Sequence, residues 1–365
     1  MENTKSIYLD YNSTSIIRPA VLNALTDSYK FFNASSVHHF GVRSRKEINN
    51  AREAIAKVIN VDPDGLIFTS GATEANVSVI ENSKRNLLIS AIEHDSVIVP
   101  ANYKPNTKII SVLSNGLICL NSLEEILKKS TEPYLISTML VNNETGVIQP
   151  IKSLVKLAHK YNALVHCDAV QALGKIPINI KSLGVDYATF SAHKIGGPQG
   201  IGVLWVKPGI EYFPLIKGGG QENFKRAGTE NISGIIGFSE AVKCISNEEN
   251  SYILSLRNYL EVELSKIAPI VIFGEGQDRI PNTLYFGNPK ISKEVQLIAL
   301  DLFGIGVSSG SACSSGKVAN SHVLQAMGVK ENIISSAIRV SLGWATKKNE
   351  IDYFVSKWSE IYMNN

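Results

Sequence analysis

The sequence predicts an α/β protein with a mostly parallel sheet in a large domain and a smaller α/β domain toward the C-terminus. From about residue 7 to residue 340, short apolar runs of strand length alternate with amphipathic segments of helix length. This alternation implies right-handed crossovers between parallel strands. A chain of 365 residues is also too long for one ordinary core and suits two domains.

The strands expected in the large domain are short apolar runs bounded by turn residues. They cover residues 66–69, 87–90, 134–141, 163–167, 187–191 and 202–206. Helical periodicity falls between several of these runs, for example at residues 48–58 and 151–161.

A polar patch at residues 246–251 marks the expected change of domain. We expect a large domain at 16–250, and a small domain made of residues 1–15 together with 251–365. The small domain should contain a strand at 337–342 and a closing helix near 351–362.

Composition and charge exclude several classes of protein. The 36 basic and 33 acidic residues are interspersed, so no basic stripe predicts direct nucleic-acid binding. The N-terminus lacks the pattern of a signal peptide, and no run of 18 apolar residues predicts a membrane span. The 4 cysteines form no CxxC pair, which argues against a disulfide framework and a zinc site. We therefore expect a cytoplasmic protein with reduced thiols.

Polar residues follow the expected strands, at the edge where open α/β sheets bind ligands. The strand at 66–69 runs into a small-residue turn at 70–76. Its N–H groups and hydroxyl suit a phosphate, and an ordinary helix N-cap at Thr73 is the alternative. His94 and Asn143 follow the next two strands, where each alone is also typical of a structural turn.

Asp168 and Lys194 stand after two later strands. A carboxylate at the end of a buried strand is costly unless a positive group meets it. For Asp168 that group is either the pyridine nitrogen of a cofactor or an unseen Lys or Arg. Lys194 lies between the strand at 187–191 and a Gly-Gly-Pro turn at 196–198, with little room to reach solvent. Burial lowers the pKa of an amine and suits Schiff-base chemistry, although most lysines are solvated surface charges.

The C-terminal part carries three further signals. Consecutive glycines at 218–220 indicate backbone that bends or approaches something closely, and a mobile surface loop is the alternative. Cys313 stands in a Ser/Gly-rich stretch at 308–316 that we expect to be flexible, so its thiol is either a nucleophile or exposed by chance. Arg339 shares a strand face with Ser341, and is either a clamp for a carboxylate or an exposed strand charge.

Taken together, these segments resemble the NifS/IscS-type cysteine desulfurases of the class-V aminotransferase family. The resemblance covers nearly the whole chain, with motifs in the family's order. They are Ser-Gly-Ala-Thr-Glu (70–74), Val-Asn-Asn-Glu-Thr-Gly (141–146), Ser-Ala-His-Lys (191–194) and Ser-Ser-Gly-Ser-Ala-Cys (308–313). The resemblance implies fold type I of the pyridoxal-phosphate-dependent transferases, the cofactor pyridoxal 5'-phosphate and the substrate L-cysteine.

The same resemblance implies roles for individual residues. Lys194 would hold the cofactor covalently, His94 would stack on its ring and assist proton transfer, and Cys313 would receive the sulfur as a persulfide. Asn143 and Arg339 would bind the substrate carboxylate. The residues that would bind the cofactor are Ala72, Thr73, Asp168, Gln171, Ser191, His193, Lys194 and, from a second subunit, Thr229.

Among these, Asp168 would pair with the pyridine nitrogen and Gln171 with the ring hydroxyl. Thr73, Ser191 and His193 would hold the phosphate, joined by Thr229 from the second subunit. The resemblance also implies a homodimer and a scaffold or acceptor protein that takes the sulfur for iron–sulfur cluster assembly or thio-modification. We expect no resident metal; the one metal contact would be between Cys313 and a transient iron–sulfur cluster.

Two departures from the family's pattern bear on these expectations. Residues 12–15 differ from the Ala-Thr-Thr ending usual in the family, so we expect a different packing of that turn. The chain also stops soon after Trp358, in the region that helps relatives to dock a scaffold protein, which leaves the identity of the acceptor open. A selenocysteine lyase or an aminotransferase on the same fold is an alternative, although Cys313 speaks against a plain aminotransferase. A non-catalytic partner protein is the alternative from another class.

Overall fold

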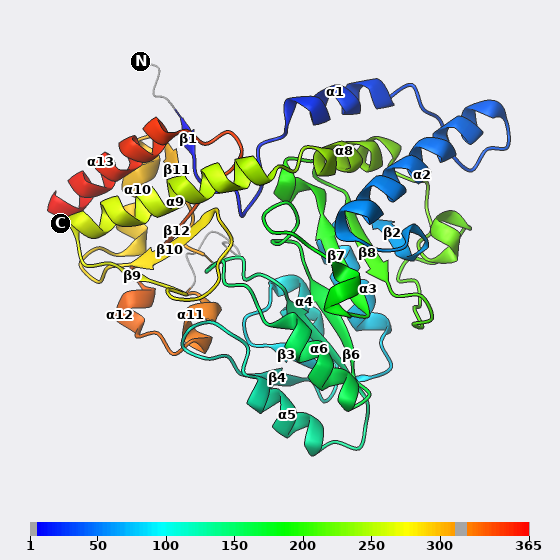
Figure 1. The fold of residues 1–365 in the computed structure, drawn as a ribbon, viewed down its shortest axis with the longest axis horizontal. Coiled ribbons are helices and arrows are strands. Elements are labelled where there is room, and N and C mark those ends of the chain that lie inside the picture. Colours follow the sequence, from blue (N-terminus) through cyan, green and yellow to red (C-terminus); the bar gives the residue numbers. More distant parts are fainter. Residues whose placement is uncertain (1–5, 311–319, 365) are drawn as a thin grey trace.

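The computed structural model describes residues 6–310 and 320–364. Its elements fall into two groups, seen on the right and the left of Figure 1. One group surrounds a large sheet, and the other gathers the N-terminal strand with the elements from residue 247 onward.

The large sheet is mostly parallel. Its strands are β2 (Leu66–Thr69), β3 (Asn86–Ser90), β4 (Lys108–Ile110), β5 (Tyr134–Met139), β6 (Leu164–Asp168), β7 (Tyr187–Ser191) and β8 (Gly202–Val206). They lie in the order β2-β8-β7-β6-β5-β3-β4. β8 pairs antiparallel with β2 and β7, and the other neighbours are parallel. The predicted α/β class with a mostly parallel sheet is confirmed.

The expected strands are found, with ends that shift by a few residues. β2, β7 and β8 have the predicted bounds. The strand expected at 134–141 is too long, because the chain leaves the sheet after Met139 and Val141 pairs with Ile148 instead. β4 was not predicted, since it is a three-residue edge strand with Lys108 exposed, too short to show a periodicity.

Helices cover both faces of this sheet. They are α1 (Pro19–Ser28), α2 (His39–Ile59), α3 (Ala72–Asn82), α4 (Asp95–Asn102), α5 (Leu120–Lys128), α6 (Ile151–Lys160), α7 (Ile180–Leu183) and α8 (Ile232–Lys243), with 3-10 turns η1 (Pro63–Gly65), η2 (Ala192–Ile195) and η3 (Gln221–Phe224). α1 and α2 both pack on α8, above the sheet in Figure 1. Within the described residues, no helix is both long and apolar enough to cross a membrane.

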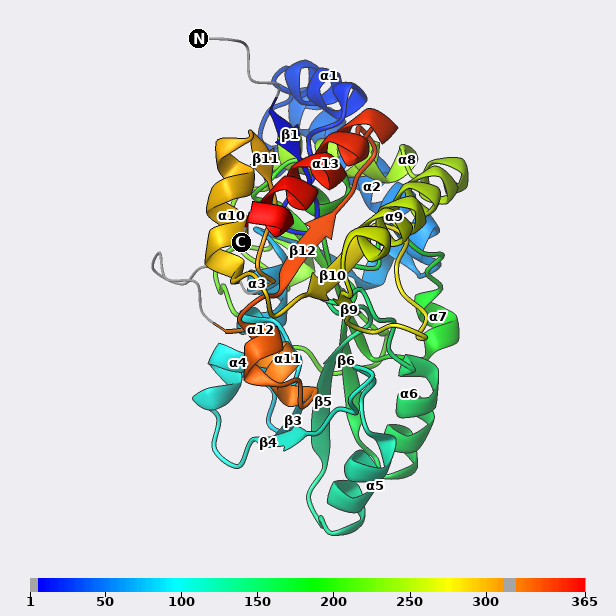
Figure 2. The same ribbon diagram turned by 90° about the vertical axis from the view of Figure 1, so that its left-hand side faces the viewer.

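The second group contains small sheets covered by long helices. Its strands are β1 (Ile7–Tyr8), β9 (Val271–Ile272), β10 (Thr283–Gly287), β11 (Ile305–Gly306) and β12 (Ile338–Ser341), and its helices are α9 (Asn247–Ile267), α10 (Lys293–Leu302), α11 (His322–Ala326), α12 (Glu331–Ile334) and α13 (Lys348–Asn364). β1 pairs with β11, and β10 lies between β12 and β9. Figure 2 shows α10, α13 and α9 side by side across this group.

Of the four buried apolar clusters among the described residues, the two largest belong one to each group. One cluster packs the large sheet against its helices and includes Ile55, Phe190 and Phe238. The other is built around Trp358 and Phe354 and includes residues of β1, β10 and β12. Ser246 lies between the groups as the N-cap of α9, and its side chain accepts a hydrogen bond from the Glu249 N–H. We propose that the clusters are the cores of two domains with the expected bounds, 16–250 and 1–15 with 251–365.

Candidate active site

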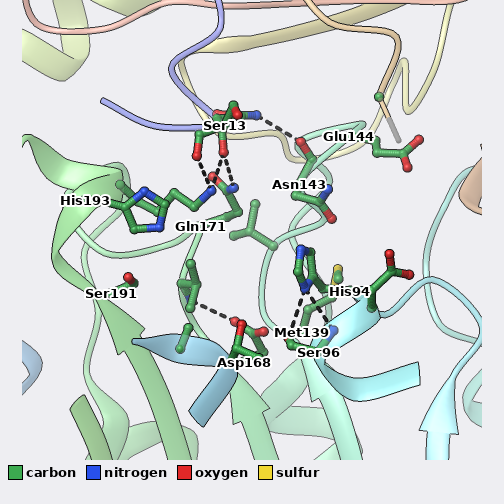
Figure 3. Close-up of a pocket in the computed structure, with 18 of the residues that line it drawn as sticks. Ser13, His94, Ser96, Met139, Asn143, Glu144, Asp168, Gln171, Ser191 and His193 are labelled. Carbon is green, nitrogen blue, oxygen red and sulfur yellow. Dashed lines mark hydrogen bonds between the residues drawn. The ribbon is translucent and has the colours of Figure 1, made fainter. Parts of the chain in front are cut away.

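A cavity of about 430 Å³ lies where the carboxyl ends of β5, β6 and β7 face the second group. Figure 3 shows its lining, to which both groups contribute side chains. The lining residues that were expected from the sequence are Ala72, Thr73, His94, Asn143, Asp168, Gln171, Ser191, His193, Lys194 and Arg339. The fold therefore brings together residues from six separate segments of the chain, as expected for the edge of an open α/β sheet.

Lys194 lies in η2, directly after β7. Gly196 follows with a φ of 81°, the left-handed conformation that glycine adopts without cost, so the chain turns away sharply. The Lys194 Nζ donates to the carbonyl oxygens of Asn12 at 2.7 Å and Ser13 at 2.6 Å. Burial and the nearby Arg339 lower the pKa of Lys194 to about 8, although Asp168 acts in the opposite direction. A large share of this amine is therefore neutral near pH 8.

Asp168 ends β6 and is 7% exposed. Its Oδ1 accepts from the Val170 N–H at 3.0 Å, and its Oδ2 accepts from the Asn76 amide at 2.8 Å. Both donors are neutral, and no Lys or Arg of the described chain forms an ion pair with this carboxylate. The structural salt bridge considered from the sequence is therefore not found there, and the charge faces the cavity.

His94 is the N-cap of α4, and its ring orientation is fixed. Its Nδ1 accepts from the backbone N–H of Ser96 at 3.1 Å and lies 2.9 Å from the Ser96 hydroxyl. The neutral ring therefore carries its proton on Nε2. The Asn76 amide donates to both the Ser96 hydroxyl, at 2.9 Å, and Asp168. One buried asparagine thus ties the acid at the end of β6 to the cavity histidine.

The start of α3 forms a wall rich in donors. Gly71 is its N-cap without a side-chain cap, so the alternative of a cap at Thr73 is wrong. The first N–H groups of a helix have no intrahelical acceptor and suit an anion. Ser191 and His193 lie beside this turn in the cavity lining. Burial, with Lys194 and Lys175, lowers the pKa of His193 to about 4, so it is neutral at pH 7.

Arg339 enters the cavity from β12 and is only 4% exposed. The alternative of an exposed strand charge is therefore wrong. One guanidinium nitrogen donates to Asp10 Oδ1 at 2.7 Å and another to the Asn143 carbonyl at 3.0 Å. The buried Nε has no partner among the described residues. An unpaired buried donor of this kind suits an acceptor supplied by a ligand.

Two expected site residues are not placed in this cavity. Cys313 lies outside the described residues, although Gly310 before it and His322 after it both line the cavity. Thr229 is exposed and is not part of the lining. Its segment is tied to the first turn of α3 by an ion pair between Arg226 and Glu74 at 3.0 Å.

Several lining residues were not among the site residues expected from the sequence, although Glu144 and Ser308 belong to motifs noted there. They include Asn12, Ser13, Met139, Glu144, Ser308 and His322. Asn12 had been noted only as part of an unusual N-terminal stretch. Its contacts with Lys194 join segments 182 positions apart, so no local pattern could have indicated them.

Comparison with known proteins places the chain in a family. Residues 7–354 match the family model of the class-V aminotransferases. A cysteine desulfurase IscS of Dictyoglomus turgidum is 40% identical, over 96% of this chain and 92% of that protein. A cysteine desulfurase of Klebsiella pneumoniae is 38% identical, over 96% of this chain and 91% of that protein.

Solved structures agree with these relatives. A NifS-like protein from Rickettsia africae superposes with a TM-score of 0.92 at 39% identity, covering 98% of this chain and 100% of that one. A protein named SspA, solved in complex with cysteine, superposes with a TM-score of 0.81 at 28% identity, covering 92% and 99%. The chain is a fold type I transferase of the class-V aminotransferase family. Within that family it belongs with the cysteine desulfurases of the NifS/IscS type.

Proposed function

We propose that the protein is a pyridoxal-phosphate-dependent cysteine desulfurase that converts L-cysteine to L-alanine and transfers the sulfur to Cys313. The observation that carries this proposal is the pairing, in one cavity, of a lysine whose pKa is about 8 with a buried carboxylate that forms no ion pair with a Lys or Arg of the described residues. The first suits covalent attachment of an aldehyde, and the second suits a protonated pyridine nitrogen.

The remaining walls fit the rest of the cofactor. The N–H groups at the start of α3, with Thr73, Ser191 and His193, can bind a phosphate from several directions. Gln171 offers a side-chain amide to the ring hydroxyl. When bound, pyridoxal phosphate supplies the electron sink for negative charge at the substrate Cα. Asp168 would keep the ring nitrogen positive and so sustain that role.

Side chains of the cavity would hold the amino acid and move its protons. Arg339 would bind the substrate carboxylate through its unpaired Nε, next to Asn143. Neutral Lys194 would accept the Cα proton. His94 would present its Nε2–H to the same region and assist proton transfer.

Sulfur transfer requires a nucleophile, which we assign to Cys313. Its thiolate would attack the substrate sulfur, so that an S–S bond forms and the Cβ–S bond breaks. The electron pair of the broken bond is protonated at Cβ, which yields alanine and a persulfide on Cys313. The chain on both sides of this residue reaches the cavity at Gly310 and His322, which supports the assignment.

The test is the Cys313→Ala variant of the holoenzyme. We expect it to bind pyridoxal phosphate like the parent but to release alanine from cysteine at least about 10³-fold more slowly, because the covalent nucleophile is lost. Alanine and sulfide are measured with a reductant present. Cys244→Ala is the matched control, because that thiol ends α8 away from the cavity and its loss should leave the rate unchanged.

An unchanged rate of alanine release in Cys313→Ala would reject desulfuration through this residue and favour an aminotransferase. A parent protein that binds no pyridoxal phosphate would reject the cofactor assignment.

We also infer that two copies form a dimer with shared sites. The segment from Tyr29 to Val42 carries an apolar surface that this single chain leaves uncovered. Its exposed side chains are Tyr29, Phe32, Val37, Phe40 and Val42. Large exposed apolar patches of this kind often bind a protein surface. Thr229 lies outside its own chain's cavity and would reach the phosphate of the second copy.

We propose that the persulfide sulfur passes to an acceptor or scaffold protein, for iron–sulfur cluster assembly or thio-modification. The relatives named IscS support the first destination. Such chemistry requires a reducing compartment, and we infer the cytoplasm. The free thiols of Cys119, Cys167 and Cys244 are consistent with it.

A further inference from the structure

A second lysine of lowered pKa lies behind the cavity and has no role in the reaction described above. Lys175 lies in the irregular segment between β6 and α7 and does not line the main cavity. Its Nζ donates to the Gln171 Oε1 at 2.5 Å and to the Asn12 Oδ1 at 2.9 Å. It therefore contacts two side-chain amides whose other ends reach the cavity.

These two contacts decide which way each amide faces. A lysine amine offers at least two N–H donors, whether it is charged or neutral, and both amides meet it with their oxygen atoms. An amide rotated by half a turn would place its NH2 group against this donor. Burial, together with Lys194 and Arg339, lowers the pKa of Lys175 well below its ordinary value. Even the neutral amine keeps one N–H for each oxygen.

For Gln171 the contact with Lys175 acts together with a second contact. The Oε1 atom accepts from Lys175, and the Nε2 donates to the Asn12 carbonyl at 2.9 Å. Because a carbonyl oxygen can only accept, both contacts require the same orientation of the amide. One N–H of the same NH2 group then remains for the cavity. Without the lysine, only the Asn12 carbonyl would hold this orientation.

The Asn12 side chain links Lys175 to the residues expected to bind the substrate carboxylate. Its Nδ2 donates to the Asn143 carbonyl at 3.0 Å and to Thr283 Oγ1 at 2.8 Å. The Asn143 carbonyl is also the acceptor for Arg339. Asn12 has a second restraint, because Asn282 donates to its Oδ1 at 3.1 Å. Each amide therefore has one restraint on its orientation besides Lys175: Asn282 for Asn12, and the Asn12 carbonyl for Gln171.

We propose that Lys175 is a positioning residue that, together with the Asn12 carbonyl, holds the Gln171 amide so that it presents an N–H donor, and not a carbonyl, to bound pyridoxal phosphate. This inference rests on the proposed function only in the identity of the cofactor. The lysine acts through Gln171 and Asn12, and touches neither the cofactor nor the substrate.

The first test measures the affinity of the apoprotein for pyridoxal phosphate by absorbance titration, without cysteine. We expect Lys175→Met to weaken binding roughly tenfold, since one oriented hydrogen bond is lost. Lys175→Arg keeps N–H donors and should recover part of the loss. Lys181→Met, an exposed lysine in α7, is the matched control and should bind like the parent.

A double-variant cycle separates positioning from a general effect of charge. If Lys175 acts through Gln171, the variant Lys175→Met/Gln171→Leu should bind no more weakly than Gln171→Leu alone. The proposal would be overturned if the losses of cofactor affinity in the two single variants were additive in the double variant. A Lys175→Met protein that binds pyridoxal phosphate like the parent would overturn it too.

A further variant keeps the inference testable if Lys175→Met does not fold. Gln171→Glu retains an oxygen for Lys175 but presents only acceptor atoms to the cavity, so it should also bind roughly tenfold more weakly. Parent-like affinity in Gln171→Glu would reject the proposal. Because no cysteine is added, a parent that binds the cofactor but makes no persulfide would refute the desulfurase function and leave this result intact.

Discussion

At the scale of single residues, the chemistry of the site depends on which of two lysines faces the cavity. Lys194 and Lys175 both have a lowered pKa, but only Lys194 lines the cavity, and Lys175 is held by two amide oxygens behind it. Position rather than basicity therefore selects the amine that can react.

This difference predicts how pyridoxal phosphate is captured. The neutral amine is the nucleophile, so capture by the apoprotein should rise with pH and be half-maximal near pH 8, the pKa of Lys194. An ordinary lysine, with a pKa of about 10.4, would show the same rise some two units higher. Borohydride reduction followed by peptide mapping should locate the cofactor on Lys194 alone. A label on Lys175, or a half-maximum near pH 10, would contradict the assignment.

Asn76 illustrates how a residue without chemistry of its own can organise a site. It is fully buried in α3 and donates to Asp168 and Ser96 with the same NH2 group. Ser96 in turn holds His94. Asn76 therefore helps to hold both Asp168, which is expected to bind the ring nitrogen, and His94, which is expected to move protons.

At the scale of elements, the start of α3 lies close to β8 because Gly202 has no side chain. A Cβ at this position would lie 2.6 Å from the Gly71 carbonyl carbon and 2.9 Å from the Phe190 carbonyl oxygen. Both neighbours are backbone atoms that cannot rotate away. The close packing of β8 on the 70–73 turn thus positions the donors expected to bind phosphate.

Gly202→Ala should therefore push this turn away from the sheet. We expect a loss of about 1–3 kcal/mol in the free energy of unfolding and weaker binding of pyridoxal phosphate. Thermal unfolding and absorbance titration measure the two effects. Gly306→Ala in β11 is the control, because its Cβ would lie 3.7 Å from the nearest atom, an ordinary contact. Equal stability of the two variants would show that the turn can move without cost.

At the scale of the whole molecule, each cavity is expected to be completed by a second copy of the chain. Val37, 93% exposed, lies in the apolar surface from Tyr29 to Val42 that we assign to this interface. Because the Val37 side chain is almost wholly exposed, a charge there should leave the monomer's fold unchanged.

Val37→Asp should weaken the dimer by about tenfold or more, since it buries a charge in an apolar contact. It should also lower cofactor affinity, because Thr229 of the second copy would be lost from the phosphate. Sedimentation at several protein concentrations measures the first effect. Val262→Asp in α9, 53% exposed on the other group, is the control. A fully active parent monomer, or an unchanged dimer in Val37→Asp, would reject this interface.

The sequence by itself determined the α/β class, most strands of the large sheet and the polar residues at their ends. These features are local: apolar periodicity shows within a few residues, and parallel strands place their carboxyl ends at one edge. It is for this reason that Asp168, Lys194 and His94 could be named as candidates before the fold was known, whereas Gln171 was named only through the family resemblance.

Only the tertiary structure determined the burial and the contacts of those candidate residues. Arg339 is buried on β12 and forms an ion pair with Asp10, 329 positions away. Asn12 contacts Lys194 and Lys175 only because the N-terminal segment crosses between the two apolar clusters. Burial and the nearness of other charges set the pKa of a lysine, and both depend on segments that periodicity does not connect. The candidates followed from the sequence, whereas the reactivity of Lys194 followed from packing.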